Sequence, residues 1–446
     1  MNPKIFLLCL SILWSGSGIK AQQDSIWTLQ ECIAHALEQN IQVRKSGLSN
    51  QSLVYQAEQT KAQRFPSVSG SVSQNFNWYK SSSMDGFGNT VYGNGFDGSN
   101  GTTYSVNSGV TVFNASKLTN QIKQANLDIE GGKYNLETTK ESISLSILDA
   151  FLQVLYAEEQ VKNSEKQIES TSGQLNLASE RLALQVISQA DYSQVKSQLA
   201  SEKLNLANAV TQFAIARVIL MQLMELPVTD NFAIAHPNLE ESLNQDRTPE
   251  VQKVFATALS IKPQIKNAAI NKEIAALDEK IARAGYFPTL SASAGASTRF
   301  SSDTDDEYFS QLDNGLSPSV GFSLAIPIYQ KKQVKTSVEL AKIGYQNAEL
   351  SETDTKNQLR KSIEQACLDV TSAQIQYEAS QENFQATQES SALSDEKFTQ
   401  GIINSVDYLV SKTNLIVAES QLLQSKYNLI FRYKILDFYL GIPLSL

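Results

Sequence analysis

The residue types that most often carry out chemistry are scattered along this sequence. The two histidines, His35 and His236, stand far apart and outside any group of spaced metal ligands. Past the first residues only Cys32 and Cys367 remain, and we expect them to be small buried residues rather than nucleophiles. Because no set of acids, bases or ligands converges, we expect no enzyme activity, no cofactor and no metal site.

Three polar or flexible segments carry the remaining candidates. The acidic run from Asp303 to Glu307 lacks the later ligands of an EF-hand, which favours a solvated loop over a calcium site. The glycine-rich stretch at 86–95 lies outside any strand–glycine–helix context and is interpreted as a flexible loop. Gly401 is expected to supply a left-handed turn residue. Six residues on, Asp407 opens a helical pattern, where the helix dipole favours a carboxylate.

The first 21 residues have the composition of a secretory signal peptide. Lys4 precedes an apolar run from Ile5 to Trp14, which is too short to span a membrane as a helix. Removing Lys4 and Lys20 with this segment would leave 35 of the 37 basic residues against 46 acidic ones, a net charge near −11. Such a surface argues against a nucleic-acid partner.

The second half of the sequence repeats the first. A shift of 216 residues places 113–227 over 329–443 without a gap, and upstream of a loop the shift becomes 222. Matched identities include Ala150 with Ala366, Val154 with Val370, Glu180 with Glu396, Asp191 with Asp407, Tyr192 with Tyr408 and Pro227 with Pro443. This self-similarity indicates an internal duplication.

Each copy has the same order of parts. A helix ends at a Phe-Pro dipeptide, because the residue before proline is pushed out of helical geometry, and an extended region and two long helices follow. The sequence therefore predicts a signal peptide over 1–21, a first structural repeat over 22–227, an equatorial connection over 228–248 and a second structural repeat over 249–446. In the first repeat we expect strands at about 67–79 and 103–113 and long helices at about 115–226. In the second repeat we expect strands at about 289–300 and 317–328 and long helices at about 331–440.

The extended regions alternate with period two, which marks strands. One face is apolar, with aromatic residues near the ends, and the other is small and hydroxylated, as in Val68, Gly70, Val72, Phe76 and Trp78 against Ser67, Ser69, Ser71, Ser73, Asn75 and Asn77. Each predicted strand is long enough for a tilted transmembrane strand. No stretch of about eighteen apolar residues follows the signal, so we expect membrane insertion as a β-barrel, with lipid outside and water inside.

The helical regions carry heptad patterns. Apolar or small residues recur with 3-4 spacing in Ile147, Ala150, Val154, Ala157 and Val161, and again in Ile363, Ala366, Val370, Ala373 and Tyr377. Such seams make helices coil about one another. The first long helix of each copy, near 55 residues, would extend about 80 Å.

Four membrane strands cannot close a barrel, and open edges are not tolerated in lipid. Two chains would give eight strands, whose interior side chains would fill, whereas three would give twelve and leave a bore. The long helices would carry that bore away from the membrane. The inferred function is a conduit.

The sequence resembles the TolC-type outer-membrane efflux protein family over essentially its whole length after the signal. The resemblance rests on Phe65-Pro66 and Phe287-Pro288 before the strands, on 112–114 and 327–329 after them, and on the second turn at 396–409, which has an aromatic residue, a glycine three residues on and an aspartate six beyond. It implies a homotrimer with a 12-stranded β-barrel and a periplasmic α-barrel. That trimer would be the outer-membrane exit duct of a tripartite efflux or type I secretion system in a Gram-negative bacterium, with a periplasmic adaptor and an inner-membrane pump as partners.

The resemblance also implies roles for the hairpin tips. Candidates for the channel constriction are Asp407, Phe398 and Ile403, and candidates for adaptor docking are Gln185, Ser188, Asp191, Gly401, Asn404 and Ser405. A ring of three Asp407 carboxylates and a dipole-stabilised first-turn Asp407 are equally favoured readings, and both can hold.

The tips also depart from the family pattern. Gln185 replaces the expected glycine of the first turn, which predicts two unlike turns. Phe398 and Ile403 stand at the positions of a tyrosine and an arginine, so we expect closure to rely on apolar packing of Phe398, Ile402 and Ile403.

Two functional questions stay open at this level. A trimeric coiled-coil outer-membrane protein of structural or adhesin-like function is the alternative to a channel, although such a protein needs no internal duplication. For a channel, the sequence does not separate export of drugs and toxic compounds from export of proteins.

Overall fold

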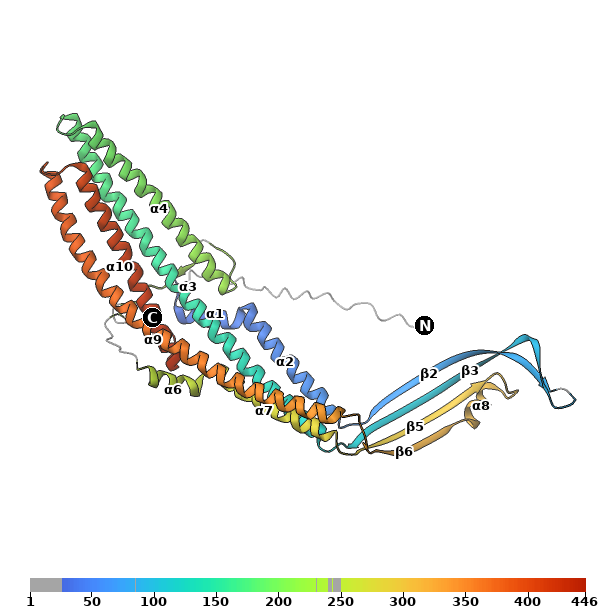
Figure 1. Ribbon diagram of the computed structural model, residues 1–446. Coiled ribbons are helices and arrows are strands. Elements are labelled where there is room, and N and C mark those ends of the chain that lie inside the picture. Colours follow the sequence, from blue (N-terminus) through green and yellow to red (C-terminus); the bar gives the residue numbers. More distant parts are fainter. Residues whose placement is uncertain (1–25, 85, 230, 240–242, 244–249) are drawn as a thin grey trace, which may run out of the picture.

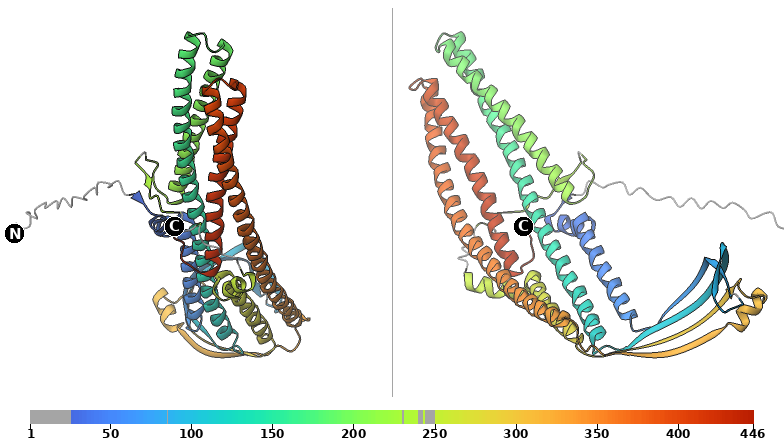
Figure 2. Two further views of the ribbon diagram at one scale, coloured as in Figure 1. Left: turned by 90° about the vertical axis from the view of Figure 1, so that its left-hand side faces the viewer. Right: turned by 45° about the vertical axis from the view of Figure 1, so that its right-hand side comes forward.

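The computed structural model describes residues 26–84, 86–229, 231–239, 243 and 250–446, so the predicted signal peptide over 1–21 lies outside the described residues. The chain is elongated, with a β-sheet at one end and two long helical hairpins at the other (Figure 1). The hairpins end in two separate tips (Figure 2). Elements from both halves of the sequence contact one another in the sheet and in the helices.

Two very long helices run through the helical part. α3 (Lys117–Ala183) and α9 (Gln333–Thr399) each contain 67 residues, and α4 (Gln189–Leu223) and α10 (Ser405–Leu440) return from their ends with 35 and 36 residues. At 1.5 Å per residue, α3 is about 100 Å long. The predicted length near 55 residues is therefore too short. The heptad pattern covers only the part of α3 and α9 that pairs with the returning helices. The part of each long helix near the sheet packs against other helices.

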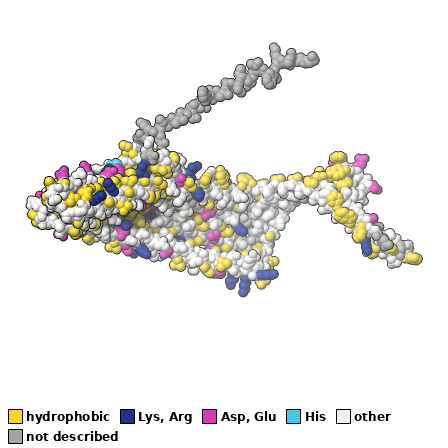
Figure 3. All heavy atoms as spheres, turned by 90° about the horizontal axis from the view of Figure 1, so that it is seen from above, with side chains coloured by type: hydrophobic (Ala, Val, Ile, Leu, Met, Phe, Trp, Pro, Cys, Tyr) yellow, Lys and Arg dark blue, Asp and Glu magenta, His cyan; other side chains and the backbone are white. Residues whose placement is uncertain are grey.

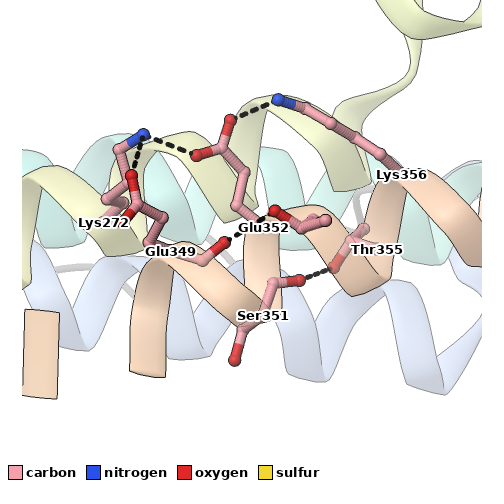
Figure 4. A network of polar contacts seen from close by, with 7 residues as sticks. Lys272, Glu349, Ser351, Glu352, Thr355 and Lys356 are labelled. Carbon is pink, nitrogen blue, oxygen red and sulfur yellow. Dashed lines mark hydrogen bonds and ion pairs between the residues drawn. The ribbon is translucent and has the colours of Figure 1, made fainter. Parts of the chain in front are cut away.

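Those partners are the shorter helices, α1 (Leu29–Gln39), α2 (Ile41–Ala62), α6 (Val251–Ile261) and α7 (Pro263–Ala284). α2 packs on α3, and α7 packs on both α3 and α9. Figure 4 shows one polar link in this region: Lys272 of α7 lies 2.9 Å from Glu352 of α9, which also pairs with Lys356. The sheet-proximal half thus contains α2, α3, α7 and α9, and the tip half contains α3, α4, α9 and α10.

The hydrophobic core is thickest in the middle of the helical part. The predicted seam residues Ile147, Val154, Ile363 and Val370 are buried there. One cluster joins α1, the middle of α3 and the end of α4, and a second joins α6, α9 and α10. A two-stranded parallel sheet, β1 (Ile26–Trp27) with β4 (Ala233–Ile234), ties the start of the described chain to the connection between the halves. Toward the tips burial decreases, so the hairpin ends depend on fewer apolar contacts.

The four-stranded antiparallel sheet has the order β2-β3-β5-β6. Its strands are β2 (Ser67–Met84), β3 (Thr90–Phe113), β5 (Thr289–Ser301) and β6 (Ser317–Ala325). β2 and β3 therefore run well past the predicted ends at 79 and 103. The segment 80–101 between the predicted strands is mostly strand, including the part of the predicted glycine-rich loop from residue 90 on, because its backbone pairs along the hairpin whatever the β propensity of its side chains. β6 ends three residues before the predicted boundary at 328.

The strand register keeps the two predicted faces separate. Val72 pairs with Tyr104, and Val106 pairs with Ala296, so apolar positions of neighbouring strands share one face. On the other face Ser71 and Ser105 are hydrogen-bonded at 2.7 Å. Hydrophobic side chains are conspicuous on the surface at the outer end of the sheet (Figure 3).

A short helix, α8 (Tyr308–Asn314), covers part of the apolar face at the outer end of the sheet. The Tyr308 hydroxyl lies 2.6 Å from that of Tyr104, its ring packs on Phe300, and Thr298 Oγ1 donates to the Leu312 carbonyl at 2.6 Å. The acidic run from Asp303 to Glu307 is exposed and irregular and leads directly into this helix.

One long helix exposes an apolar side. Among the described residues, α4 is the one helix whose length and hydropathy would suit a membrane span, although little of that stretch is buried. The exposed residues include Val210, Ile215 and Ile219. Polar positions such as Gln212 and Arg217 interrupt this stretch, so it is not a continuous run of about eighteen apolar residues. This face is left uncovered by the chain itself.

Candidate functional site: the two hairpin tips

The first tip connects α3 to α4 through a tight turn. Gln185 has a positive φ of 60°, a conformation that costs a non-glycine residue about 1–2 kcal/mol. Ser188 caps α4: its Oγ accepts from the Asp191 amide at 3.1 Å, and Asp191 Oδ2 accepts from the Ser188 amide at 3.2 Å. This reciprocal capping box fixes the start of α4.

The second tip connects α9 to α10 with the same backbone turn. Gly401 has φ 73°, so its predicted role as a left-handed turn residue is confirmed. Asn404 caps α10 by accepting from the Asp407 amide at 2.8 Å. The turn hydrogen bonds match those of the first tip: Val186 donates to Arg181, and Ile402 donates to Lys397. The prediction of two unlike turns is therefore wrong for the backbone, because Gln185 adopts the glycine-like conformation.

Side-chain hydrogen bonds join the two tips within one chain. Arg181 near the end of α3 donates to the last carbonyls of α9, at 2.7 Å to Thr399 and 3.4 Å to Phe398. The Phe398 carbonyl also accepts from the Gly401 amide at 3.1 Å, so the main action of the guanidinium is to cap the Thr399 carbonyl from the other hairpin. Ser405 Oγ donates to Asp191 Oδ1 at 2.5 Å. We call these two contacts the tip link.

The tip link also acts on the charge of Asp191. Hydrogen bonds from Ser188 first, and from Ser405, lower the pKa of the Asp191 carboxyl below its usual value. The structure thus brings together three predicted docking residues, Ser188, Asp191 and Ser405, and engages them with one another. Gln185, Gly401 and Asn404 remain exposed at the turns.

The predicted constriction residues divide into two groups. Phe398 stacks on Tyr408 within the second hairpin, with ring centroids 4.6 Å apart, and Tyr408 is only 1% exposed. Burial raises the pKa of the Tyr408 hydroxyl well above its usual value. Asp407 and Ile402 are exposed, and Ile403 is half-buried. Phe398 therefore packs in its own hairpin, whereas Asp407 occupies the first turn of α10, as the dipole reading requires.

Sequence reasoning missed Arg181 and the packing role of Tyr408. Arg181 falls on Lys397 in the repeat, which marked the position as cationic but gave no sign of a contact more than two hundred residues away. Tyr408 lies in the predicted heptad pattern of the last long helix, and Phe398, on which its ring stacks, was predicted to be a constriction residue instead.

The other chemistry-bearing residues have structural partners. Burial raises the pKa of the Cys32 thiol to about 12, which keeps it from reacting as a thiolate. His35 packs edge-on against Trp27, and His236 Nε2 lies 3.0 Å from a Glu158 oxygen. Over the described ranges, no group of three or more histidine, cysteine or acidic residues has a metal-binding arrangement.

Comparisons with known proteins extend over both halves of the chain. A sequence profile of the family described as outer membrane efflux protein matches residues 32–225 and 254–441. No curated protein matches the sequence.

Several solved structures share the fold. The first is that of CusC, described in terms of folding and transmembrane channel formation, with 17% identity, a TM-score of 0.76 and coverage of 95% of this chain and 96% of that chain. The CmeC outer membrane channel of Campylobacter jejuni has 16% identity, a TM-score of 0.76 and coverage of 93% and 85%. The MtrE outer membrane channel of Neisseria gonorrhoeae, solved in its open state, has 17% identity, a TM-score of 0.74 and coverage of 94% and 90%.

Proposed function

The chain belongs to the outer membrane efflux protein family, and we propose that three copies of it form one exit duct of a tripartite export system. The protein is an outer-membrane efflux channel, a passive conduit and not an enzyme. Family membership also removes the adhesin-like alternative. The proposal concerns the assembly, the gate and the docking surface.

The open edges of the sheet carry the proposal of a trimer. In the order β2-β3-β5-β6, the outer edges of β2 and β6 have no strand beside them within the described chain. An open edge in lipid leaves backbone groups without hydrogen bonds, so β6 of one copy would pair with β2 of the next. Three copies give a 12-stranded β-barrel, wide enough for a bore.

The helices support the same assembly. The exposed apolar face of α4 would be covered by a neighbouring copy, since soluble surfaces rarely keep such a patch open. Helices about 100 Å long, side by side around one axis, would continue the barrel as a periplasmic α-barrel.

We further propose that the chain arose by duplication, with a signal peptide at 1–21, repeats at 22–227 and 249–446 and an equatorial connection at 228–248. Residues with positive φ support the repeats: Ala115 and Ser116 match Lys331 and Lys332 at the shift of 216, and two further pairs follow the same rule. These further pairs are Gln185 with Gly401 and Glu225 with Gly441. Unfavourable backbone conformations rarely recur at one spacing by chance.

The tip link supports a gate at the hairpin ends. Arg181 and Asp191 bind the second hairpin to the first within a chain, so the three second hairpins cannot spread apart until these contacts break. Asp407, exposed in the first turn of α10, would form the ring of three carboxylates. Phe398 would hold the tip in shape through Tyr408, and Ile402 and Ile403 would supply apolar contacts between copies.

The adaptor would dock on the residues that the tip link leaves free. These are Gln185, Gly401 and Asn404, flanked by exposed apolar side chains such as Val186 and Ile402. Ser188, Asp191 and Ser405 would contribute indirectly by fixing the turn positions.

The assembly is tested by extraction and mass measurement. The full chain, expressed with its signal, should fractionate with the outer membrane, and the detergent-purified protein should have the mass of three chains by light scattering. A soluble monomer would refute both the trimer and its barrel. The docking proposal is tested separately by crosslinking the adaptor to a cysteine placed at Gln185 or Asn404, with Glu130→Cys, far from the tips on α3, as control.

A further inference from the structure

A small polar cavity lies where the two hairpins meet below the tips. It is about 40 Å³ in volume and is formed by α3, α4 and α10, which run side by side in the tip half (Figure 1). Six of its lining side chains are amides or hydroxyls, two are the carboxylates of Glu202 and Glu419, and the ninth is an isoleucine. This is a set of oxygen donors rather than an apolar packing defect, and the volume suits one ion or one to two waters.

Glu202 of α4 gives the cavity its charge. Its side chain is buried, with 2% of the residue exposed, and Oε1 accepts from Gln198 Nε2 at 3.0 Å. Glu202 lines the cavity, and its Oε2 is buried without any hydrogen-bond partner. Across the residues the structure describes, no lysine, arginine or histidine forms an ion pair with Glu202. A buried carboxylate oxygen in this state is costly unless a cation or a proton compensates it.

Two further side chains complete the arrangement. Gln167 of α3 lines the cavity, and its Nε2 is buried without a partner. The oxygen and nitrogen of an amide are assigned from the surrounding hydrogen bonds, so rotation by 180° would place the Gln167 oxygen inward. Glu419 of α10 is half-buried on another wall, with Lys166 and Lys412 near enough to act on its charge. Each of the three helices therefore supplies at least one oxygen donor.

We propose that this cavity binds a single hard cation of the calcium class, with Glu202 Oε2 as its anchoring ligand. A bound water could pair with Glu202 Oε2 and with Gln167, but it would leave the Glu202 charge uncompensated. A cation held by Glu202 Oε2 and by the amide oxygen of the rotated Gln167 side chain pairs with both side chains and compensates the charge. The amide and hydroxyl oxygens would complete the coordination. Because the donors come from α3, α4 and α10, an ion here would hold the two hairpins together below the tip link.

The test measures binding of the metal alone to the purified full-length protein in detergent. Equilibrium binding of radioactive calcium is compared between wild type, Glu202→Gln and the control Glu169→Gln, an exposed glutamate of α3. Wild type and control should bind one more calcium per chain than Glu202→Gln. The acidic segment at 303–307 is common to all three proteins and cancels in the difference. Equal stoichiometry in all three would overturn the proposal.

A second variant guards against a folding failure of the first. Gln167→Glu adds a carboxylate to the cavity, so it should bind calcium several-fold more tightly, melt at lower temperature in EDTA and recover on adding calcium. Two results would contradict the proposal. One is that Gln167→Glu binds calcium no more tightly than wild type. The other is that wild type binds no extra calcium while Glu202→Gln raises the melting temperature in EDTA, which would mean that the cavity holds a proton or water. Because neither measurement depends on channel activity, failure here is distinct from failure of the proposed function.

Discussion

The two hairpin tips share one backbone but not one set of side chains. Gln185 and Gly401 both adopt the left-handed conformation, and the turn hydrogen bonds follow the same pattern. Yet Ser188 caps the first tip with a full capping box, whereas Asn404 caps the second with a single side-chain bond. The first tip also reaches across to the second through Arg181. The same backbone hydrogen bonds therefore maintain both turns, while different side chains give the two hairpin tips of one chain different contacts.

The largest predicted effect is at the aromatic pair of the second tip. Tyr408→Ala removes a buried ring that stacks on Phe398, and should lower the local stability of 395–410 by about 3 kcal/mol. Tyr192→Ala, the matching change in the half-buried first tip, should cost clearly less. Amide hydrogen exchange measured by mass spectrometry reports both. Equal effects would mean that the two tips pack alike.

The next effect is at the tip link. Arg181→Ala removes the hydrogen bond that caps the Thr399 carbonyl and the longer one to Phe398, and should speed amide exchange at the end of α9 by a factor that corresponds to about 1 kcal/mol. The matched control is Lys397→Ala, at the equivalent position of the second tip. If Lys397→Ala speeds exchange at the end of α3 as much, the link is not specific to the first hairpin.

Exchanging the turn residues should produce opposite signs. Gly401→Gln places a side chain at φ 73° with open space beside it, so only backbone strain opposes it, at about 1 kcal/mol. Gln185→Gly relieves the same strain in the first turn and should slow exchange there. A destabilising Gln185→Gly would show that the Gln185 side chain contributes more than its conformation costs.

The smallest effect is the pH dependence of Asp191. Because its folded pKa is lowered, the carboxylate contributes stability above the usual aspartate pKa of 3.8, and this contribution is lost as pH falls through the lower folded value. Asp191 is half-buried at the end of a hairpin, where water still screens its interactions, so the gain is a few tenths of a kcal/mol. Exchange near Ser405 should therefore be faster in Asp191→Asn than in wild type at pH 7 and equal near pH 2. A difference that persists at pH 2 would assign the effect to something other than charge.

Periodicity predicted much of the architecture from the sequence. The heptads placed Val154 and Val370 in the core, and the alternation of Val72 with its serine neighbours gave the two faces of the sheet. The family assignment is confirmed by the profile match. These features depend on local patterns that repeat over many residues, which sequence reasoning handles well.

The rest depended on contacts that local patterns do not encode. The pairing of 80–101 as strands arises from the partner strand, and α8 is held by Tyr104 and Thr298 from other strands. The left-handed Gln185 was missed because only glycine signals that conformation plainly. The hydrogen bonds of Arg181 and Ser405 join residues more than two hundred positions apart. The cavity at Glu202 depends on how three helices are rotated relative to one another, which the sequence pattern does not determine.

The channel and its gate are tested most directly by the single-channel conductance of the purified protein in planar bilayers. Wild type should show small, uniform openings, and the double variant Arg181→Ala with Asp191→Ala should show openings several-fold larger, because the second hairpins are released. Asp407→Ala should alter the cation preference. Absence of channels in every protein would contradict the channel itself, and equal conductance of wild type and the double variant would contradict a gate held by the tip link.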